Sequence, residues 1–266
     1  MQLTAEDAGV QQMPTLKQNL LAEFMGTMFL VTAAIASTIL PFNLDGSTVV
    51  LAVFINAIAV AFVLFALIET FGSISGAHFN PAVTLALLTA GDIDRSKAAK
   101  YIVVQIAGGL IGMLVAHLMF IGTTSTFYAD TNMLFTISES VKEPALYFAE
   151  FVGTFLLVGV IMGCVRGGSK HTGLSVAMVV GGMLVTTSST MFANPAVTIA
   201  RMFTYAICGI APESAVFFII TEVLGGITAA VVFGYLYPSK LKDKCDPFDC
   251  KKPITVQNPP SNGGAF

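Results

Sequence analysis

The sequence predicts an all-α membrane protein with six transmembrane helices and two re-entrant half-helices, arranged as an inverted repeat. Of its 266 residues, 55% are hydrophobic and only 11% are charged, whereas roughly a quarter of the residues in an average soluble protein are charged. Six apolar runs are long enough to cross a bilayer, and the sequence Asn-Pro-Ala-Val-Thr occurs twice, at 80–84 and 194–198. Much of the surface must therefore face lipid.

The apolar runs give the order of the elements. A span needs about 20 mainly apolar residues, and the six runs are 19–40, 48–70, 98–121, 145–166, 173–192 and 214–237. Two further apolar pieces, 80–89 and 194–204, are too short to cross. Backbone at membrane depth that does not span must be buried in protein or line a water-filled cavity. We therefore expect two half-helices that fold in from opposite sides.

Each half-helix has a start signal. Asparagine is a favoured N-cap, and proline fits the first helical position, where its missing N–H costs nothing. Asn80 and Asn194 are therefore predicted N-caps, followed by Pro81-Ala82 and Pro195-Ala196.

The chain also repeats itself. Ala-Glu-Phe opens the first span at 22–24 and the fourth span at 149–151, and each is followed two spans later by Asn-Pro-Ala-Val-Thr. Three spans per half give the halves, 19–121 and 145–237, opposite polarity in the membrane. Proteins built this way place their site at the midplane, between the halves.

Positive charge predicts the orientation, because cytoplasmic loops carry an excess of Lys and Arg. The loops at 41–47, 122–144 and 205–213 hold a single basic residue, Lys142, beside five acidic ones. The opposite side carries Arg95, Lys97, Lys100, Arg166, Lys170 and the lysines that follow residue 238.

Both termini are therefore predicted to be cytoplasmic. The predicted organisation is an N-terminal segment at 1–18, a channel domain at 19–238 and a disordered tail at 239–266. In the tail, Cys245 and Cys250 either bind a soft metal or arsenite, both of which prefer thiolates, or remain free reduced thiols.

The half-helices predict the chemistry of the path. Each helix N-terminus carries about half a positive charge, so two that meet at the midplane repel cations and protons. The side-chain amides of Asn80 and Asn194 can offer N–H donors. The backbone carbonyls before each cap can line the path, at Gly76, Ala77, His78, Phe79, Thr190, Phe192 and Ala193. Such a lane suits small neutral solutes that form hydrogen bonds.

On these motifs, the chain resembles the aquaporin (major intrinsic protein) family over 19–237. The resemblance implies a right-handed, aquaporin-like bundle with an hourglass pore in each protomer, assembled as a homotetramer in the plasma membrane. It also gives Glu23 and Glu150 the role of buried acceptors that hold the re-entrant loops. From the residues alone, a proton relay is the alternative for these carboxylates.

The resemblance places a narrow filter at Val60, Gly182, Met191 and Val197. Water-selective members have an aromatic residue, His, a small residue and Arg at these positions, so this chain departs at all four and lacks the filter arginine. We expect a wider, more apolar constriction. The run 194–201 resembles a microbial subgroup associated with metalloid and small-solute passage, which makes arsenite, glycerol and urea the candidate solutes.

Arg201 lies four residues after Val197, on the same helical face and about 5.4 Å further along. Two interpretations stay open for it. Its side chain reaches back from the outer vestibule and partly replaces the missing filter arginine, or it is fixed at the mouth by a carboxylate or by carbonyls. His78 similarly is either a packed, hydrogen-bonded residue or part of a cytoplasmic gate.

The predicted function is a passive channel for water or small uncharged solutes, with no cofactor and no metal site. A secondary active transporter is the alternative, because inverted repeats with broken helices serve both. A structural protein that forms junctions is a third possibility, without permeability. No nucleophile, base and orienting group converge in the sequence, so an enzyme is not expected. The net charge of −3 gives no basic field for nucleic acid.

Overall fold

The computed structural model describes residues 13–44, 48–123 and 133–238. These residues form eight α-helices and the loops between them. The helices are α1 (Leu16–Asn43), α2 (Val49–Ser75), α3 (Pro81–Ala90), α4 (Arg95–Phe120), α5 (Pro144–Gly167), α6 (Thr172–Thr186), α7 (Pro195–Arg201) and α8 (Pro212–Leu236). The predicted tail, with Cys245 and Cys250, lies outside the described residues.

Five of the helices are long and apolar enough to cross a membrane: α1, α2, α4, α5 and α8. Their outer faces carry large apolar side chains such as Phe62 and Phe148, which are 72% and 71% exposed. A soluble protein cannot leave so many apolar faces in water. The chain is therefore a multi-pass membrane protein.

The fifth predicted span is shorter than expected. The sequence predicted apolar helix over 173–192, but α6 has 15 residues and ends at Thr186. Thr187 takes an extended conformation, and the following residues run as irregular backbone to Asn194. The backbone N–H of Thr190 bonds to the Thr187 carbonyl, and that of Met191 bonds to the Thr187 and Ser189 hydroxyls, so these groups do not continue the helical ladder. The backbone N–H groups of Phe192 and Ala193 bond to Glu150.

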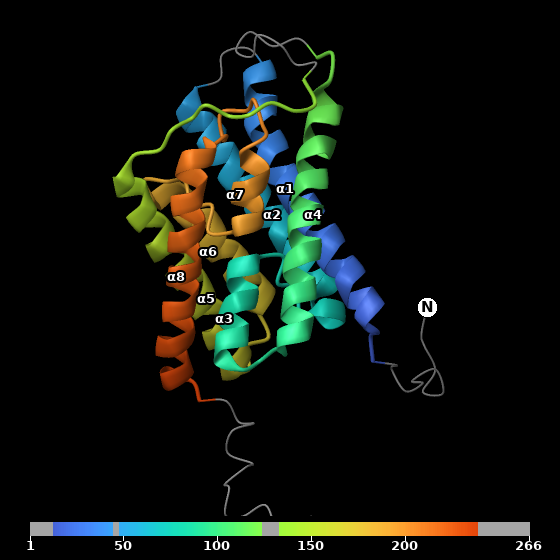
Figure 1. The fold of residues 1–266 in the computed structure, drawn as a ribbon, viewed down its shortest axis with the longest axis vertical. Helices are drawn as coiled ribbons and strands as arrows, with labels where there is room; N and C mark the ends of the chain where they lie inside the picture. Colours follow the sequence, from blue (N-terminus) through green and yellow to red (C-terminus); the bar gives the residue numbers. More distant parts are fainter. Residues whose placement is uncertain (1–12, 45–47, 124–132, 239–266) are drawn as a thin grey trace, which may run out of the picture.

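The helices form a single bundle in which α3 and α7 enter from opposite ends and meet near the middle (Figure 1). The long helices pair as α1 with α4 and α5 with α8. The half-helices cross over, because α3 packs against α8 and α7 against α4. Each half of the repeat thus supports the half-helix of the other.

Glycine permits the close pairing of the long helices. A Cβ at Gly108 of α4 would overlap the backbone carbonyl of Phe24 in α1, and a Cβ at Gly225 of α8 would overlap that of Phe151 in α5. In lipid, where no hydrophobic force drives helices together, such close approach supplies the packing.

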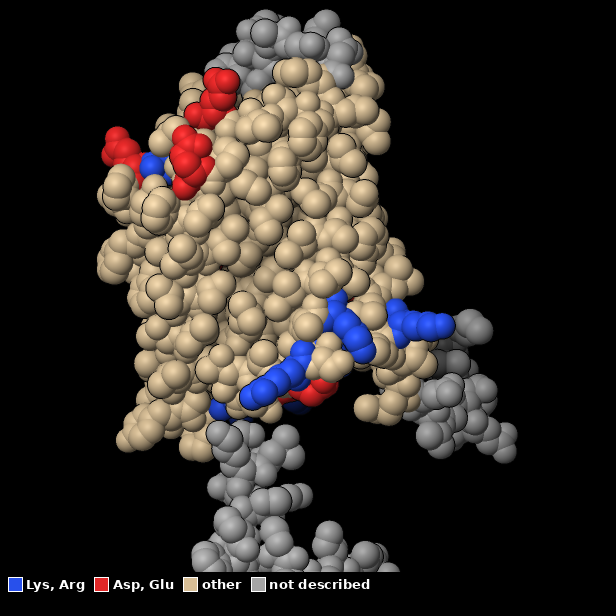
Figure 2. Space-filling view, viewed as in Figure 1, with Lys and Arg blue, Asp and Glu red and all other residues tan. Residues whose placement is uncertain are grey.

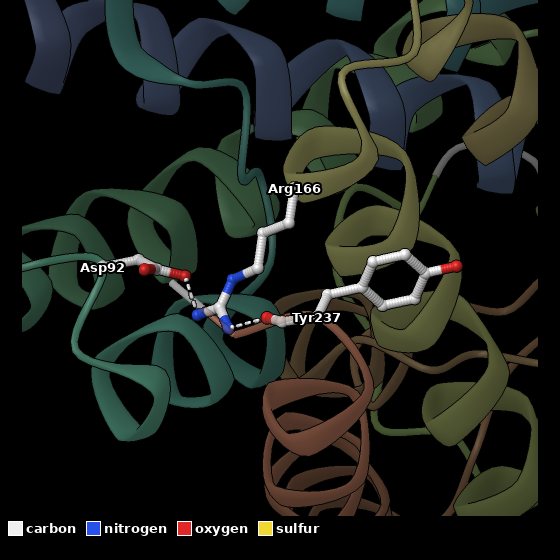
Figure 3. A network of polar contacts seen from close by, with 3 residues as sticks. All are labelled: Asp92, Arg166 and Tyr237. Carbon is white, nitrogen blue, oxygen red and sulfur yellow. Dashed lines mark hydrogen bonds and ion pairs between the residues drawn. The ribbon is translucent and has the colours of Figure 1, made fainter. Parts of the chain in front are cut away.

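Charge separates along the bundle. Most Lys and Arg side chains gather at the end where α1 begins and α8 ends, and acidic side chains gather at the opposite end (Figure 2). At the basic end, Arg166 joins the two halves (Figure 3). Its Nη2 lies 2.8 Å from Asp92 Oδ2, and its Nη1 donates to the Tyr237 carbonyl at 2.8 Å.

Candidate channel site

Both half-helices begin as the sequence predicted. Asn80 Oδ1 accepts from the backbone N–H of Ala82 at 2.8 Å, and Asn194 Oδ1 accepts from that of Ala196 at 3.0 Å. Pro81 and Pro195 occupy the first helical positions. The two helices therefore turn their positive N-terminal ends toward each other at the middle of the bundle.

The two asparagine amides are crossed between the halves. Asn80 Nδ2 donates to the Ala193 carbonyl at 2.7 Å, and Asn194 Nδ2 donates to the Phe79 carbonyl at 2.9 Å. An amide has two N–H groups, so one N–H of each asparagine ties the halves together. No acceptor among the described residues takes the second, and both side chains line the central cavity defined below.

Glu23 and Glu150 make the bracing contacts expected of them. Glu23 accepts from the backbone N–H groups of His78 at 3.0 Å and Phe79 at 2.7 Å. Glu150 accepts from those of Phe192 at 2.9 Å and Ala193 at 2.7 Å. Both carboxylates are fully buried. The N–H groups before each cap are thereby satisfied away from the channel.

The backbone before each cap is strained at matching positions. The residues one and three places before each asparagine have positive φ: 50° at Ala77, 48° at Phe79, 32° at Met191 and 48° at Ala193. This conformation costs a residue other than glycine about 1–3 kcal/mol and persists only where the surroundings impose it. The glutamate braces and crossed amides supply that constraint.

A narrow cavity of about 70 Å³, here called the central cavity, runs between the two motifs. A second cavity of about 670 Å³, here called the vestibule, lies at the basic end of the bundle, and Ala77 and His78 line both cavities. Among the predicted residues, the central cavity is lined by Val60, Ala77, His78, Asn80, Met191, Phe192, Ala193, Asn194, Val197 and Arg201. Gly76 lines the vestibule instead.

Three predicted positions lie off this surface. At Phe79 the prediction concerned the backbone carbonyl, which accepts from Asn194 Nδ2, whereas the ring packs edge-on against Phe71 at 6.2 Å. Thr190 lines neither cavity. Gly182 is exposed, and no heavy atom lies within 4 Å of where its Cβ would be.

On α6, the central cavity is lined by Val176, Val180 and Leu184, which are spaced by four residues, as one helix face requires. Gly182 is not among the residues that line this cavity, so its place in the filter stays a prediction. Further apolar wall residues that the sequence analysis did not name are Leu30, Ala34, Leu64, Ile68, Val83, Leu157 and Ile161.

Arg201 is 2% exposed and lines the central cavity. Its guanidinium carbon lies 4.1 Å from the centre of the Phe192 ring, a distance typical of a cation–π contact. Its Nε is buried without a hydrogen-bond partner, and within the described parts of the chain no carboxylate pairs with it. Of the two interpretations left open by the sequence, fixation by a carboxylate does not occur there.

Two of the three histidines are packed, whereas His171 is exposed. His78 Nδ1 lies 3.1 Å from Thr84 Oγ1, and its ring meets Tyr101 edge-on. His117 lies between Thr204 Oγ1 at 2.7 Å and the Leu134 carbonyl at 2.9 Å. No cluster of three His, Cys, Asp or Glu side chains suited to a metal exists in the part of the chain that the structure describes.

Lys142 lies near the acidic end of the bundle, outside the helices. Its Nζ donates to Ser140 Oγ at 2.8 Å. Burial, together with the nearby charge of Arg201, lowers the pKa of this lysine below its ordinary value.

Comparison with known proteins agrees with this geometry. The model of the family described as major intrinsic protein matches residues 10–193. "Aquaglyceroporin AqpS" of Rhizobium meliloti is 35% identical over 221 residues, covering 83% of this chain and 91% of that relative. "Nodulin-26" of Glycine max is 29% identical over 81% of this chain and 76% of its own length.

The fold has a solved counterpart. The X-ray structure of the aquaglyceroporin from Plasmodium falciparum superposes with a TM-score of 0.60, covering 86% of this chain and 98% of that one. At 21% sequence identity, this likeness establishes the arrangement of helices.

Proposed function

Because the chain belongs to the major intrinsic protein family, and is therefore a passive channel for water and small solutes rather than an enzyme, we propose that its pore admits uncharged solutes wider than water. The substrates are polyols, urea or the neutral hydroxides of metalloids, with glycerol and arsenite as the test cases. The name of the aquaglyceroporin relative supports glycerol.

One observation carries this proposal: the central cavity has both apolar side chains and hydrogen-bond donors on its walls. Val60, Met191 and Val197 present apolar side chains, while Asn80 and Asn194 provide amide donors beside them. Water gains nothing from an apolar wall. A solute with carbon-bound hydrogens on one side and hydroxyls on the other can bury the first, at about 25 cal/mol per Å², and bond through the second.

Arg201 completes this filter in our proposal. Its guanidinium sits over Phe192 beside Val197, one helical turn beyond the position where the family carries its arginine. Five N–H donors and a fixed positive charge then face the lumen, with Nε unpartnered in the described structure. Together with the two half-helix N-termini, this charge opposes the entry of cations and protons.

The test is stopped-flow light scattering on reconstituted vesicles, which compares shrinkage in an impermeant osmolyte with reswelling in glycerol, urea and arsenite. We expect entry of at least one of these solutes faster than through bare lipid, without any ion gradient. Dependence on an ion gradient would instead identify a transporter. Fast water flow without solute entry would refute the wide filter.

Two variants locate the filter. Val60→Trp is expected to slow glycerol while water still passes, because it fills the lumen from α2. The matched control is Phe62→Trp on the same helix, where the side chain is 72% exposed and faces away from the channel. Arg201→Ala is expected to loosen solute selectivity, and an unchanged permeability profile would remove Arg201 from the filter.

The channel, in our proposal, sits in the plasma membrane with its basic end and both termini in the cytoplasm, as a homotetramer. The charge separation along the bundle supports this orientation (Figure 2). Labelling of single cysteines introduced at Lys97 and Glu213 by an impermeant reagent tests it, because only the second is expected to react from outside intact cells. Native mass spectrometry in detergent tests the tetramer.

A further inference from the structure

The two halves match closely around the braces, so any departure from the match is informative. Glu23 and Phe24 of α1 correspond to Glu150 and Phe151 of α5. Gly108 of α4 packs against the Phe24 carbonyl, and Gly225 of α8 packs against the Phe151 carbonyl. The next glycine of each helix, Gly109 or Gly226, faces the alanine carbonyl of the opposite half's Asn-Pro-Ala.

This match pairs Gln105 with Glu222, because each lies three residues before its first glycine. Both side chains are fully buried. In the first half, Gln105 Nε2 donates to Glu23 Oε2 at 2.8 Å and to Thr84 Oγ1 at 3.0 Å. The amide therefore supplies a hydrogen-bond donor to the back of the carboxylate brace.

In the second half a carboxyl group takes the place of that amide. Thr198, which corresponds to Thr84, donates through Oγ1 to Glu222 Oε1 at 2.6 Å. Glu222 Oε2, the atom that corresponds to the amide nitrogen, is buried without a partner. By the match of the halves, Glu150 stands to Glu222 as Glu23 stands to Gln105, and α5, which carries Glu150, packs against α8.

The charged groups around Glu222 can compensate the negative charge of only one carboxylate. The α8 helix, which carries Glu222, packs against α3, α5 and α7. The α5 helix contributes Glu150, α7 contributes Arg201, and α3 carries no titratable side chain. Glu150 accepts two backbone N–H groups as a carboxylate, and Arg201 forms no ion pair with either carboxyl group among the described residues. A second negative charge in the same dry site would be unpaired, and two adjacent carboxyls cannot both ionise there.

We infer that Glu222 is held as a carboxylic acid that donates its proton to the Glu150 carboxylate, as the Gln105 amide donates to Glu23, and that it thereby positions the filter loop, residues 190–193. Glu222 is a positioning residue, because it acts on the lumen through Glu150 and the loop. Its effect on permeation rests on the function proposed above.

The donor in the first half is permanent, whereas this one can be titrated. Loss of the proton removes the bond and sets two carboxylates against each other. The strained backbone at Met191 and Ala193 is then released, and the Met191 and Phe192 side chains that line the cavity lose their fixed positions. We expect glycerol permeability to fall at alkaline pH as a consequence.

The first measurement is infrared spectroscopy of the reconstituted protein at neutral pH, on the wild type, Glu222→Gln and Gln105→Glu. The wild type is expected to show the carbonyl stretch of a buried, protonated carboxyl group. Glu222→Gln loses that band. The matched variant Gln105→Glu gains a second one, because it rebuilds the same pair in the first half. A spectrum of Glu222→Gln identical to that of the wild type overturns the inference.

The second measurement is glycerol permeability against pH. Glu222→Leu, which lacks the donor, is expected to slow glycerol roughly tenfold or more, the effect of one lost hydrogen bond to a charged group. Glu222→Gln is expected to keep glycerol permeability near the wild-type value at neutral pH. It should also abolish the fall in permeability at alkaline pH, because an amide donates at every pH. If Glu222→Gln is as slow as Glu222→Leu, or keeps the wild-type pH profile, the inference is wrong.

The two measurements allow the inference about Glu222 and the proposed function to be refuted independently. The infrared bands require a folded protein and no transport, so a chain that passes no glycerol still tests the protonation of Glu222. Conversely, a wild-type channel with good glycerol flux and no protonated carboxyl keeps the proposed function and refutes the shared proton.

Discussion

Glu23→Gln tests the brace on the first re-entrant loop. The Glu23 carboxylate accepts four hydrogen bonds: Oε1 from Ser75 Oγ at 2.6 Å and His78 N at 3.0 Å, and Oε2 from Phe79 N at 2.7 Å and Gln105 Nε2 at 2.8 Å. A glutamine side chain keeps the size but replaces one acceptor oxygen by an NH₂ donor. Whichever way the amide turns, its NH₂ group faces two buried donors that bond to a carboxylate oxygen in the wild type.

The magnitude follows from those two donors. A buried donor left without its acceptor costs about 1–3 kcal/mol, so the variant loses roughly 2–6 kcal/mol of unfolding free energy. For a chain of this size, each kcal/mol shifts the thermal midpoint by about 2–4 °C. We therefore expect the midpoint of the detergent-solubilised protein to fall by at least about 4 °C, with slower water flow as the loop loosens.

The matched control is Glu69→Gln, the same chemical change on an exposed α2 carboxylate, which is expected to leave the midpoint near that of the wild type. Circular dichroism melts of the three proteins decide the matter. Equal midpoints for Glu23→Gln and the wild type would mean that the hydrogen bonds of Glu23 do not contribute to the stability of the folded protein.

Four further predictions follow from packing and charge. Gly225→Leu is expected to lower the thermal midpoint, because its side chain would push α8 off the α5 backbone. Gly182→Ala, an exposed site with open space, is expected to gain about 0.5–1 kcal/mol from helix propensity without changing permeability. Arg166→Gln is expected to cost about 1 kcal/mol or less, because its acidic partner is partly exposed, and a melt in high salt should reduce the difference. For Lys142, the lowered pKa means that the folded protein gives up the proton before the unfolded chain does. The free energy of unfolding should therefore rise with pH up to about the ordinary lysine value, and Lys142→Met should remove that slope in pH-dependent melts.

A Gly225→Leu variant with an unchanged thermal midpoint would contradict the close contact between α8 and α5. A Gly182→Ala channel with altered glycerol flux would return that residue to the filter. A salt-independent loss in Arg166→Gln would point to packing of its side chain rather than to the ion pair. An unchanged pH slope in Lys142→Met would assign the slope to another group.

The sequence carried the elements whose signals are local. Asn80 and Asn194 announce their half-helices because an N-cap and a proline at the first helical position act within one turn. Glu23 and Glu150 could be assigned as braces because a buried carboxylate at matching positions of two halves needs backbone donors nearby. These contacts are present as expected.

The filter position on α6 depends on counting along the chain. Counting back from Asn194 places Gly182 at the lumen only if the intervening chain has the family's usual path. Here the helix ends at Thr186, and the chain then makes a turn and passes through positive φ angles of 56° at Thr190, 32° at Met191 and 48° at Ala193. On α6, Leu184 lines the central cavity.

The tertiary contacts could not be predicted from the local sequence. Nothing in the run around Asn80 indicates that its amide bonds to the Ala193 carbonyl, 113 residues away. The stacking of Arg201 on Phe192 depends on where the filter loop folds back. The unpartnered oxygen of Glu222 is seen only in the structure, although the pairing of Gln105 with Glu222 can be inferred from the glycines that follow them.

The crossed amides have a consequence for biosynthesis. The first re-entrant loop reaches its final geometry only when the acceptor at residue 193 exists, and ribosomes add 5–20 residues per second, so the delay is on the order of 10 s. During that time the nascent first half holds an asparagine amide and a strained backbone at membrane depth, without their partners. A water-lined insertion site or another protein must shelter this segment until the second half arrives, which makes the interval between the two motifs the vulnerable period in the production of the channel.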